Sequence, residues 1–214
     1  MATSSPDALL FITPGCPNCP VVLQGLSELV KEAVIGRLTV VNVAAHPEQA
    51  EEYGVRTAPW LRLGPFTLTG AHSPAELRLW AAWANSEDSA VHYVEYLLKE
   101  GGFKQAGVFI AEDTTRLKSL LTVVANPAAN IEVRLGVGAL LEAYANKPEL
   151  QKLLPQLAEL THHADHRVRA DACHWLGLTG LAEARTYIET CLADSNEEVR
   201  EIAIEAMEVL NITF

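Results

Sequence analysis

The pattern of hydrophobic and polar positions changes character near residue 85. Before that point, short apolar runs alternate with segments that have helical spacing. Residues 8–12, 38–43, 60–63 and 66–69 are predicted as strands, because they are apolar or β-branched and lie between polar or turn-forming residues. The first part of the chain is therefore expected to build a small sheet.

Three segments of the same region are predicted as helices. Residues 17–35 and 46–53 carry helix-forming residues between these strands, and we expect Gly36 to close the first helix. A third helix follows Ser73, whose spacing from Glu76 is that of a capping box. The predicted order of elements is βαβαββα.

Beyond a polar stretch at residues 85–89, almost every segment has helical periodicity. The candidate helices are residues 90–100, 114–125, 131–145, 150–162, 167–177, 182–193 and 197–210. We therefore predict an α/β domain at residues 1–84, a linker at residues 85–89 and an all-α domain at residues 90–214.

The helical part contains an internal repeat. A Val-Arg pair recurs at Arg134, Arg169 and Arg200, spaced 35 and 31 residues apart, each time after a polar turn. The middle copy continues to Gly180 as D-x-x-V-R-x-x-A…L-G-x-x-G, which resembles HEAT-like repeats, whose helix pairs stack into a solenoid. Three copies and a degenerate one from about Ala90 are enough for a stable array. We expect each arginine to bond nearby turn carbonyls or an aspartate, rather than a ligand.

Composition and charge narrow the classes of function. The net charge is −11, with five Lys/Arg against seven Asp/Glu in residues 1–84 and eleven against twenty in residues 85–214. The acidic second part argues against nucleic-acid binding, which needs a basic face. No apolar run of about 18 residues is present, so we expect no membrane span. The first seven residues do not resemble a signal peptide, and a reducing, cytoplasmic setting is expected.

The first strand–helix junction holds the run Cys16-Pro17-Asn18-Cys19. A helix N-terminus presents free N–H groups and the positive end of the helix dipole, and both stabilise a thiolate. Two cysteines at this spacing can attack a disulfide and then resolve the mixed disulfide. A metal clip is the alternative, but a tetrahedral site needs two further ligands and there is no second C-x-x-C.

A T-x-P motif, Thr57-Ala58-Pro59, follows the cysteines by about forty residues. Together with the element order and the C-P-N-C run, it resembles the thioredoxin/glutaredoxin fold. The resemblance implies a cis proline at Pro59 that lies against the disulfide, flanked by backbone that pairs with the substrate at Thr57 and Ala58. It also implies that Cys16 attacks, that Cys19 resolves, and that Pro17 helps to shape the site.

The sequence also departs from the mainstream family pattern. Leu10 stands where thioredoxins bury an acidic residue, and no tryptophan precedes Cys16. Residues 70–73 do not supply the aspartate pair that glutaredoxins use for glutathione. The resemblance is therefore to the short glutaredoxin-like thioredoxins, and we expect neither a cofactor nor a metal.

Other candidate residues have two interpretations each. Trp60 either lines the substrate groove or packs within its strand. Cys173 and Cys191 lie on apolar helix faces and are predicted to be structural, since a redox pair would need their Cα atoms within about 7 Å. The histidine cluster 162, 163 and 166 is predicted to be an exposed polar turn rather than a metal site.

Two hypotheses of function follow from these features. In the first, the chain is a thiol–disulfide oxidoreductase that acts on a protein partner selected by the repeats and is regenerated by an upstream thiol reductase. In the second, it is a non-catalytic adapter whose dithiol senses redox state while the repeats bind a protein partner. Turnover with a reductase distinguishes them, because an enzyme cycles and a sensor only switches its binding.

Overall fold

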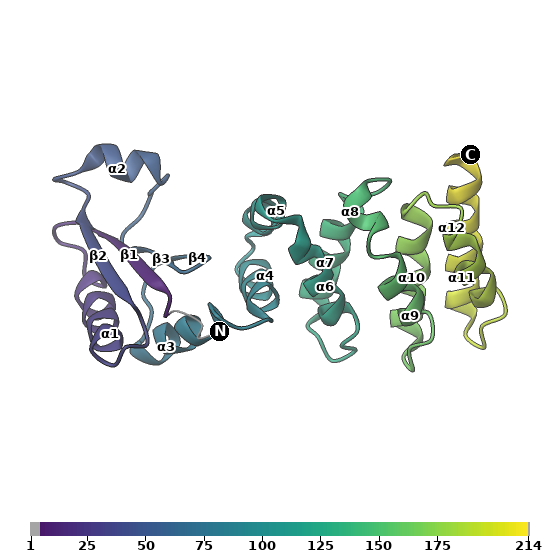
Figure 1. The fold of residues 1–214 in the computed structure, drawn as a ribbon, viewed down its shortest axis with the longest axis horizontal. Coiled ribbons are helices and arrows are strands. Elements are labelled where there is room, and N and C mark those ends of the chain that lie inside the picture. The colour runs from purple at the N-terminus through teal and green to yellow at the C-terminus, as the bar shows by residue number, and fades with distance from the viewer. Residues whose placement is uncertain (1–4, 214) are drawn as a thin grey trace. The chain divides into compact units, whose positions relative to one another are not determined.

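The structure is a computed structural model that describes residues 5–213 and divides into two compact units, Met1–Ser89 and Ala90–Phe214. Residues 1–4, which bear on the prediction of no signal peptide, lie outside the described residues. The first unit combines a four-stranded sheet with helices, and the second is helical (Figure 1). The predicted fold class is therefore confirmed.

The first unit has the predicted order βαβαββα. Its strands are β1 (Asp7–Ile12), β2 (Arg37–Asn42), β3 (Trp60–Leu63) and β4 (Phe66–Thr69). Its helices are α1 (Cys19–Lys31), α2 (Pro47–Glu52) and α3 (Pro74–Trp83). The strands are ordered β2-β1-β3-β4, with β1 parallel to β2 and the other two pairs antiparallel.

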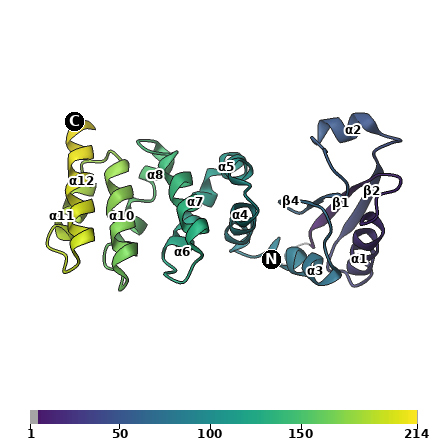
Figure 2. The ribbon, with the colours of Figure 1, turned by 180° about the vertical axis from the view of Figure 1, so that it is seen from behind.

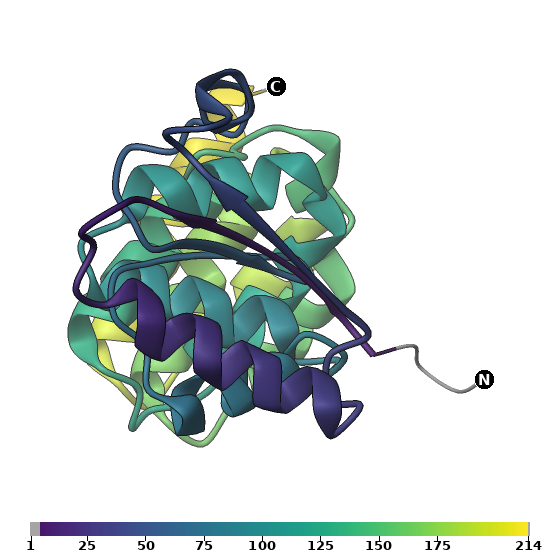
Figure 3. The same ribbon diagram turned by 90° about the vertical axis from the view of Figure 1, so that its left-hand side faces the viewer.

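Helices lie on both faces of the sheet, α2 on one and α1 with α3 on the other (Figure 1). Figure 3 shows α1 running along the strands. On the α2 face, Phe11, Val41, Ala50 and Trp60 form a buried cluster. Side chains alternate along a strand, so Leu10 points to the face that α1 and α3 cover, where it is fully buried.

Helices α1 and α3 approach each other closely at Gly25. A Cβ atom at this position would lie 2.8 Å from Leu77 Cδ1 and 3.5 Å from Pro74 Cα. The predicted capping box holds the start of α3, since the Ser73 side chain accepts from the Glu76 N–H and the Glu76 carboxylate accepts from the Ser73 N–H. The glycine and the cap together fix α3 against the helix that carries the cysteine motif.

The first helix ends earlier than predicted, at Lys31 rather than at residue 35, and Gly36 does not close it. Ala33 takes the left-handed conformation instead, with a φ of 58°. Gly36 has another role: its N–H donates to the Pro6 carbonyl, and a Cβ there would lie 3.1 Å from the Ser5 carbonyl oxygen. The glycine therefore allows two chain segments to approach just before β2.

The second unit is built from helices that follow the predicted order. They are α4 (Ser89–Lys99), α5 (Phe103–Glu112), a 3-10 turn (Thr114–Arg116), α6 (Leu117–Val124), α7 (Ile131–Glu142), α8 (Pro148–Gln151), α9 (Leu154–Leu160), α10 (His166–Leu178), α11 (Ala184–Cys191) and α12 (Glu197–Thr213). Among these, the sequence analysis missed α5. Its buried residues Ala106, Phe109 and Ile110 have helical spacing, but two glycines precede the helix and Gly107 lies within it.

The predicted helix at residues 150–162 is two short helices, α8 and α9. Pro155 lies in the first turn of α9, where a proline needs no N–H partner. The same proline in the middle of a continuous helix would remove a hydrogen bond and clash with the preceding turn. The break at Lys152 and Leu153 follows from this.

Helix pairs stand side by side in the second unit (Figure 2). The pairs are α6 with α7, α9 with α10, and α11 with α12, which match the three predicted copies. A degenerate first copy is α4 with α5, where the Tyr93 ring lies edge-on to Phe109 at 4.7 Å. Gly177 allows α10 and α12 to touch, because a Cβ there would lie 3.0 Å from Ala206 Cα.

Candidate functional site

The candidate residues of the first unit meet at one edge of its sheet. Trp60, the first residue of β3, lies opposite Phe11 near the end of β1 and opposite Thr69 at the end of β4. The end of β1, the start of β3 and the end of β4 therefore lie at the same edge of the sheet. The cysteine turn follows β1, Pro59 precedes β3, and the Gly70 N–H donates to the Pro59 carbonyl at 3.0 Å. The sheet topology therefore brings Cys16, Cys19 and Pro59 to one edge.

Cys16 and Cys19 are joined as a disulfide, with their Cα atoms 5.5 Å apart. Cys19 is the first residue of α1, so Cys16 lies just before the helix rather than in it. The Cys19 backbone N–H donates to Cys16 Sγ at 3.1 Å, and the first turn of α1 contains no acidic residue. A helix N-terminus and an N–H donor both stabilise negative charge on that sulfur.

Access differs between the two sulfurs. Cys16 is half-buried and follows an exposed Gly15, whose φ of 76° turns the chain into the motif. Cys19 is only 5% exposed. A protein disulfide can therefore reach Cys16 but not Cys19, which is the arrangement that an attacking and a resolving thiol require.

The segment before β3 leaves backbone groups available. The Ala58–Pro59 peptide bond is cis, as the resemblance implied. Thr57 is exposed, and its backbone, like that of Ala58, makes no hydrogen bond to another backbone group within residues 5–213. Backbone N–H and C=O groups need partners, so an extended peptide could pair with this segment.

The remaining predicted site residues lie as follows. Pro17 is exposed between the cysteines. Trp60 is only 7% exposed and stands edge-on to Phe11, with ring centroids 5.4 Å apart. Tyr53 belongs to the same aromatic cluster, and its ring centroid lies 5.9 Å from that of Trp60. This burial favours the packing interpretation of Trp60 over a place in the substrate groove.

The position of the thioredoxin acid is apolar in this chain. Leu10 is fully buried where thioredoxins place an acid, so that position offers no proton acceptor. Sequence reasoning missed His72, which follows β4 at the same sheet edge and is 8% exposed. Its Nε2 atom has no hydrogen-bond partner among the described residues. Nothing in the sequence distinguishes a buried histidine here from an exposed one.

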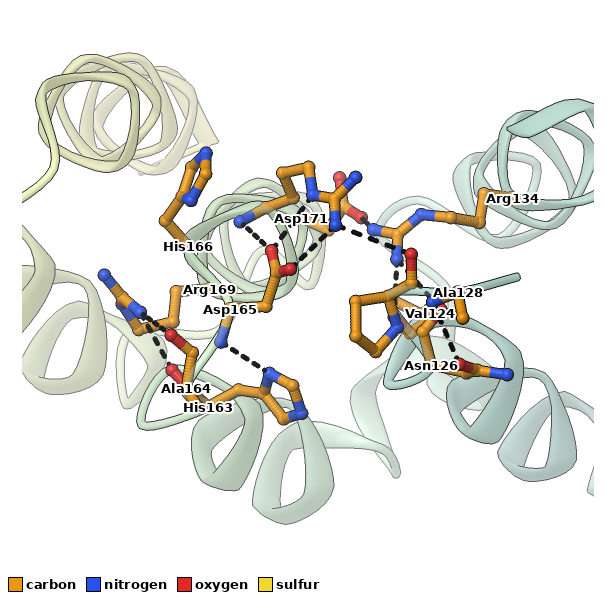
Figure 4. A network of polar contacts seen from close by, with 12 residues as sticks. Val124, Asn126, Ala128, Arg134, His163, Ala164, Asp165, His166, Arg169 and Asp171 are labelled. Atoms are coloured by element: carbon orange, nitrogen blue, oxygen red, sulfur yellow. Dashed lines mark hydrogen bonds and ion pairs between the residues drawn. The ribbon is translucent and has the colours of Figure 1, made fainter. Parts of the chain in front are cut away.

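The repeat arginines bond as predicted, and Figure 4 shows Arg134 and Arg169 with the turn carbonyls that they bind. Arg134 donates to the Val124 and Asn126 carbonyls and, at 2.6 Å, to Asp171. Arg169 donates to the carbonyls of residues 163 and 164 and forms a two-pronged pair with Asp194.

The last copy follows the same rule. Arg200 donates to the carbonyls of Asp194 and Ser195. The Arg169 guanidinium lowers the pKa of Asp194 to about 2 by hydrogen bonding, although burial opposes this shift. Asp171 behaves differently, since burial raises its pKa despite the nearby Arg134. Each arginine therefore ties the second helix of its repeat to the turn before that helix. Arg134 and Arg169 also bind an aspartate of the next repeat.

The other candidates of the second unit are buried thiols and turn histidines. Cys173 and Cys191 are buried and free of disulfides. His163 Nδ1 accepts from the Asp165 N–H, and His166 lies 3.5 Å from Glu198.

Within residues 5–213, no group of three or more His, Cys, Asp or Glu side chains could hold a metal ion. None of the helices in the described part is long and apolar enough to cross a membrane.

Two family models match the chain. The model described as a thioredoxin domain matches residues 9–82, from within β1 to within α3. The model described as HEAT repeats matches residues 117–208, from α6 into α12. No curated protein matches the chain.

Proposed function

From the thioredoxin-like domain at residues 9–82 and the HEAT repeats at residues 117–208, we propose that this protein is a thiol–disulfide oxidoreductase acting on a protein partner that the repeats select. The domain limits that we propose are residues 1–84 and 90–214, with residues 85–89 as the linker. The observation that carries the redox proposal is the Cys19 N–H donated to Cys16 Sγ at the start of α1.

The proposed reaction has two exchange steps. The Cys16 thiolate attacks one sulfur of the partner's disulfide, which forms a mixed disulfide and releases the first partner sulfur as a thiolate. Cys19 then attacks Cys16 Sγ, which releases the second partner sulfur and forms the Cys16–Cys19 disulfide. The partner gains two electrons and two protons, and the dithiol of this chain loses them.

The segment around Pro59 would hold the partner during these steps. Within residues 5–213, the backbone of Thr57 and Ala58 makes no hydrogen bond to another backbone group, and it lies at the sheet edge that the cysteine turn shares. Pairing with a partner segment there would place a disulfide beside Cys16, because β-strand addition fixes the register of an extended peptide. Pro17 would limit the approach from the other side of the motif.

The remaining parts of the proposal concern the cycle and its setting. Return to the dithiol needs an upstream thiol reductase, and a reducing compartment such as the cytoplasm supplies one. The repeats would choose the partner, because stacked helix pairs offer extended binding surfaces. No cofactor or metal takes part in this scheme.

A redox-sensing adapter is the second candidate, and Leu10 favours it. With a leucine in place of the thioredoxin acid, Cys19 lacks that proton acceptor, and repeated turnover would be slow. In this case the dithiol would switch partner binding by the repeats without a cycle.

The deciding experiment measures turnover of the full chain on a protein disulfide such as insulin, with dithiothreitol as the reductant. The proposed enzyme gives many turnovers per chain, and Cys19→Ser accumulates a mixed disulfide at Cys16. Cys16→Ser is the matched control and gives neither. A single turnover with wild-type protein supports the adapter, and no reaction at Cys16 contradicts both candidates.

A further inference from the structure

Helix α7 carries two exposed apolar side chains. Leu135 and Ile131 are the most exposed large hydrophobic residues in the part of the chain that the structure describes, at 68% and 65%. They lie four residues apart on the helix, so they share one side of it. A lone exposed leucine is common on soluble proteins, but two neighbours of this kind form a contiguous apolar spot.

The repeat does not require apolar residues at these positions. Ile131 lies three residues before the shared arginine, and Leu135 lies one residue after it. In the other copies the same two positions hold polar, charged or small residues, namely His166 with Ala170 and Glu197 with Glu201. All three copies stack as helix pairs, so stacking does not depend on Ile131 and Leu135. The apolar pair is therefore available for contact with another molecule.

The exposed sides of α7, α10 and α12 join into one surface. His174 of α10 lies 3.3 Å from Glu142 of α7, and His166 of α10 lies 3.5 Å from Glu198 of α12. These four side chains are between 43% and 60% exposed, and the two histidines lie about two turns apart on α10. Glu142 lies about two turns beyond Leu135, on the same side of α7. We call this area the acidic-apolar surface, and it comprises Ile131, Leu135 and Glu142 of α7 and Glu198, Glu201 and Glu205 of α12, with α10 between them.

The α12 end of this surface is acidic. Glu198, Glu201 and Glu205 are exposed and follow one another at spacings of three and four residues, so they share one side of the helix. Helix α12 contains no lysine, and its one arginine, Arg200, donates to two carbonyls of the preceding turn. A partner therefore gains most here if it brings positive charge, because opposite charges across an interface favour association.

The distance between the two ends sets the size of a matching partner. Helix α10 separates α7 from α12, and packed helices lie about 8–10 Å apart, so the two ends are about 20 Å apart. An α-helix rises about 1.5 Å per residue, and a helix of about 14 residues covers this distance. The side chains of stacked helices form ridges and grooves that accept a further helix. A short helix with apolar residues at one end and basic residues at the other therefore matches this surface.

We propose, on the basis of the partner-selecting role proposed above for the repeats, that the acidic-apolar surface binds a helix of a protein partner that is apolar at one end and basic at the other. Its apolar side chains pack on Ile131 and Leu135, and its lysines or arginines pair with Glu201 and Glu205. A second copy of this chain fits less well, because residues 85–214 hold eleven Lys/Arg against twenty Asp/Glu and two copies would repel each other.

The test uses a fluorescent, alanine-based peptide of about 14 residues, with two leucines four residues apart at one end and lysines at the other. Its binding to the full chain is measured by fluorescence anisotropy at low and at high salt. We expect saturable binding that weakens about tenfold at high salt, because salt screens exposed charges. Peptides with glutamate in place of lysine, or alanine in place of leucine, should bind about tenfold more weakly. Equal binding of the three peptides would overturn the proposal.

Variants on α7 test the apolar end. Ile131→Ser/Leu135→Ser should weaken binding about tenfold, because two apolar side chains lose their contact with the leucines of the peptide. Tyr187→Ser is the matched control, since Tyr187 is a 37% exposed side chain on α11, outside this surface. The control should change the affinity by less than about twofold. An unchanged affinity in the α7 variant would mean that the peptide binds elsewhere, against the proposal.

Variants on α12 test the acidic end. Glu201→Lys/Glu205→Lys should weaken binding about tenfold or more at low salt and remove most of the salt dependence. Glu183→Lys/Glu189→Lys makes the same change of net charge at exposed positions just before and within α11, and it should keep most of the affinity. Equal losses in the two variants would mean that the peptide responds to net charge alone, which also contradicts the proposal.

Two further measurements separate this surface from the redox site and from self-association. The peptide has no cysteine, so a chain that binds it but does not turn over insulin would contradict the redox proposal alone, and turnover without peptide binding would contradict the surface proposal alone. Sedimentation velocity should show a monomer. A wild-type dimer that dissociates in Ile131→Ser/Leu135→Ser would show that a second copy covers the surface, and this result would overturn the proposal.

Discussion

The two cysteine pairs of this chain have the same side chains and opposite surroundings. Cys16 and Cys19 lie at a turn before a helix, and Cys16 is partly open to solvent. Cys173 and Cys191 lie within stacked helices, at exposures of 0% and 2%. The comparison teaches that access, more than the presence of two thiols, decides which substrates a dithiol can meet. Cys16 is therefore open to a protein disulfide, whereas Cys173 and Cys191 are shielded from one.

The largest expected effect separates the pairs by function. Cys16→Ser should abolish exchange with a protein disulfide, because the other three cysteines, Cys19, Cys173 and Cys191, are buried. Cys191→Ser should leave the rate within about twofold, since a buried thiol is not a nucleophile for a protein. The measurement is turnover of insulin disulfides by the full-length variants. A comparable loss in both variants would contradict the distinction.

The next variant should expose one of the buried cysteines, Cys191, to solvent. Arg169→Ala removes the partner of Asp194, in an ion pair whose side chains are 14% and 12% exposed. Removing one partner of a buried ion pair lowers the free energy of unfolding by about 3 kcal/mol. Urea unfolding should show this loss, and alkylation of Cys191 in folded protein should speed up about 100-fold.

A matched arginine serves as the control for this variant. Arg167 pairs with Asp165 two residues away, but its side chain is 52% exposed. Arg167→Ala should cost about 0–1 kcal/mol and leave the alkylation rate of Cys191 nearly unchanged. Equal effects of the two variants would mean that the Arg169–Asp194 pair does not protect the thiol.

A smaller effect appears as the pH falls. Arg169 lowers the pKa of Asp194 from 3.8 to about 2 in the folded protein. The stability from this carboxylate is therefore fully present above the unfolded pKa and is lost as the pH falls through the folded pKa. We expect the urea midpoint of the second unit to drop over this range. Asp194→Asn should remove that part of the pH dependence, and an unchanged profile would contradict the assignment.

The smallest expected effect lies in the first unit. His72→Leu should raise the free energy of unfolding by about 1 kcal/mol, because it removes a buried Nε2 atom that has no hydrogen-bond partner in the described part of the chain. The exposed His46, paired with Glu48, is the control, and His46→Leu should give no gain. Thermal unfolding of both variants tests this. A loss of stability in His72→Leu would show that the imidazole has a compensating contact.

Local patterns predicted most of the fold. The strands at residues 60–63 and 66–69 and the Ser73–Glu76 capping box follow from alternation, turn residues and cap chemistry, all of which act over a few positions. The end of α1 did not follow, because Ala33 adopts a left-handed conformation that glycine usually takes. Helix α5 was not predicted, because glycines lie just before it and within it.

The functional residues were also predictable only where they follow from local sequence. The Cys16–Cys19 spacing and the T-x-P motif were visible in the sequence, and so was the repeated arginine. The burial of His72 was not, because it depends on how distant segments pack. Contacts between elements become predictable only once the three-dimensional arrangement is known.

The most direct test of the central claim follows all four cysteines in one redox titration of the full chain against a glutathione buffer, read by alkylation and mass spectrometry. The account predicts a two-electron transition of Cys16 and Cys19 between about −270 and −180 mV. A first pair that stays reduced throughout, or a transition only at Cys173 and Cys191, would contradict it.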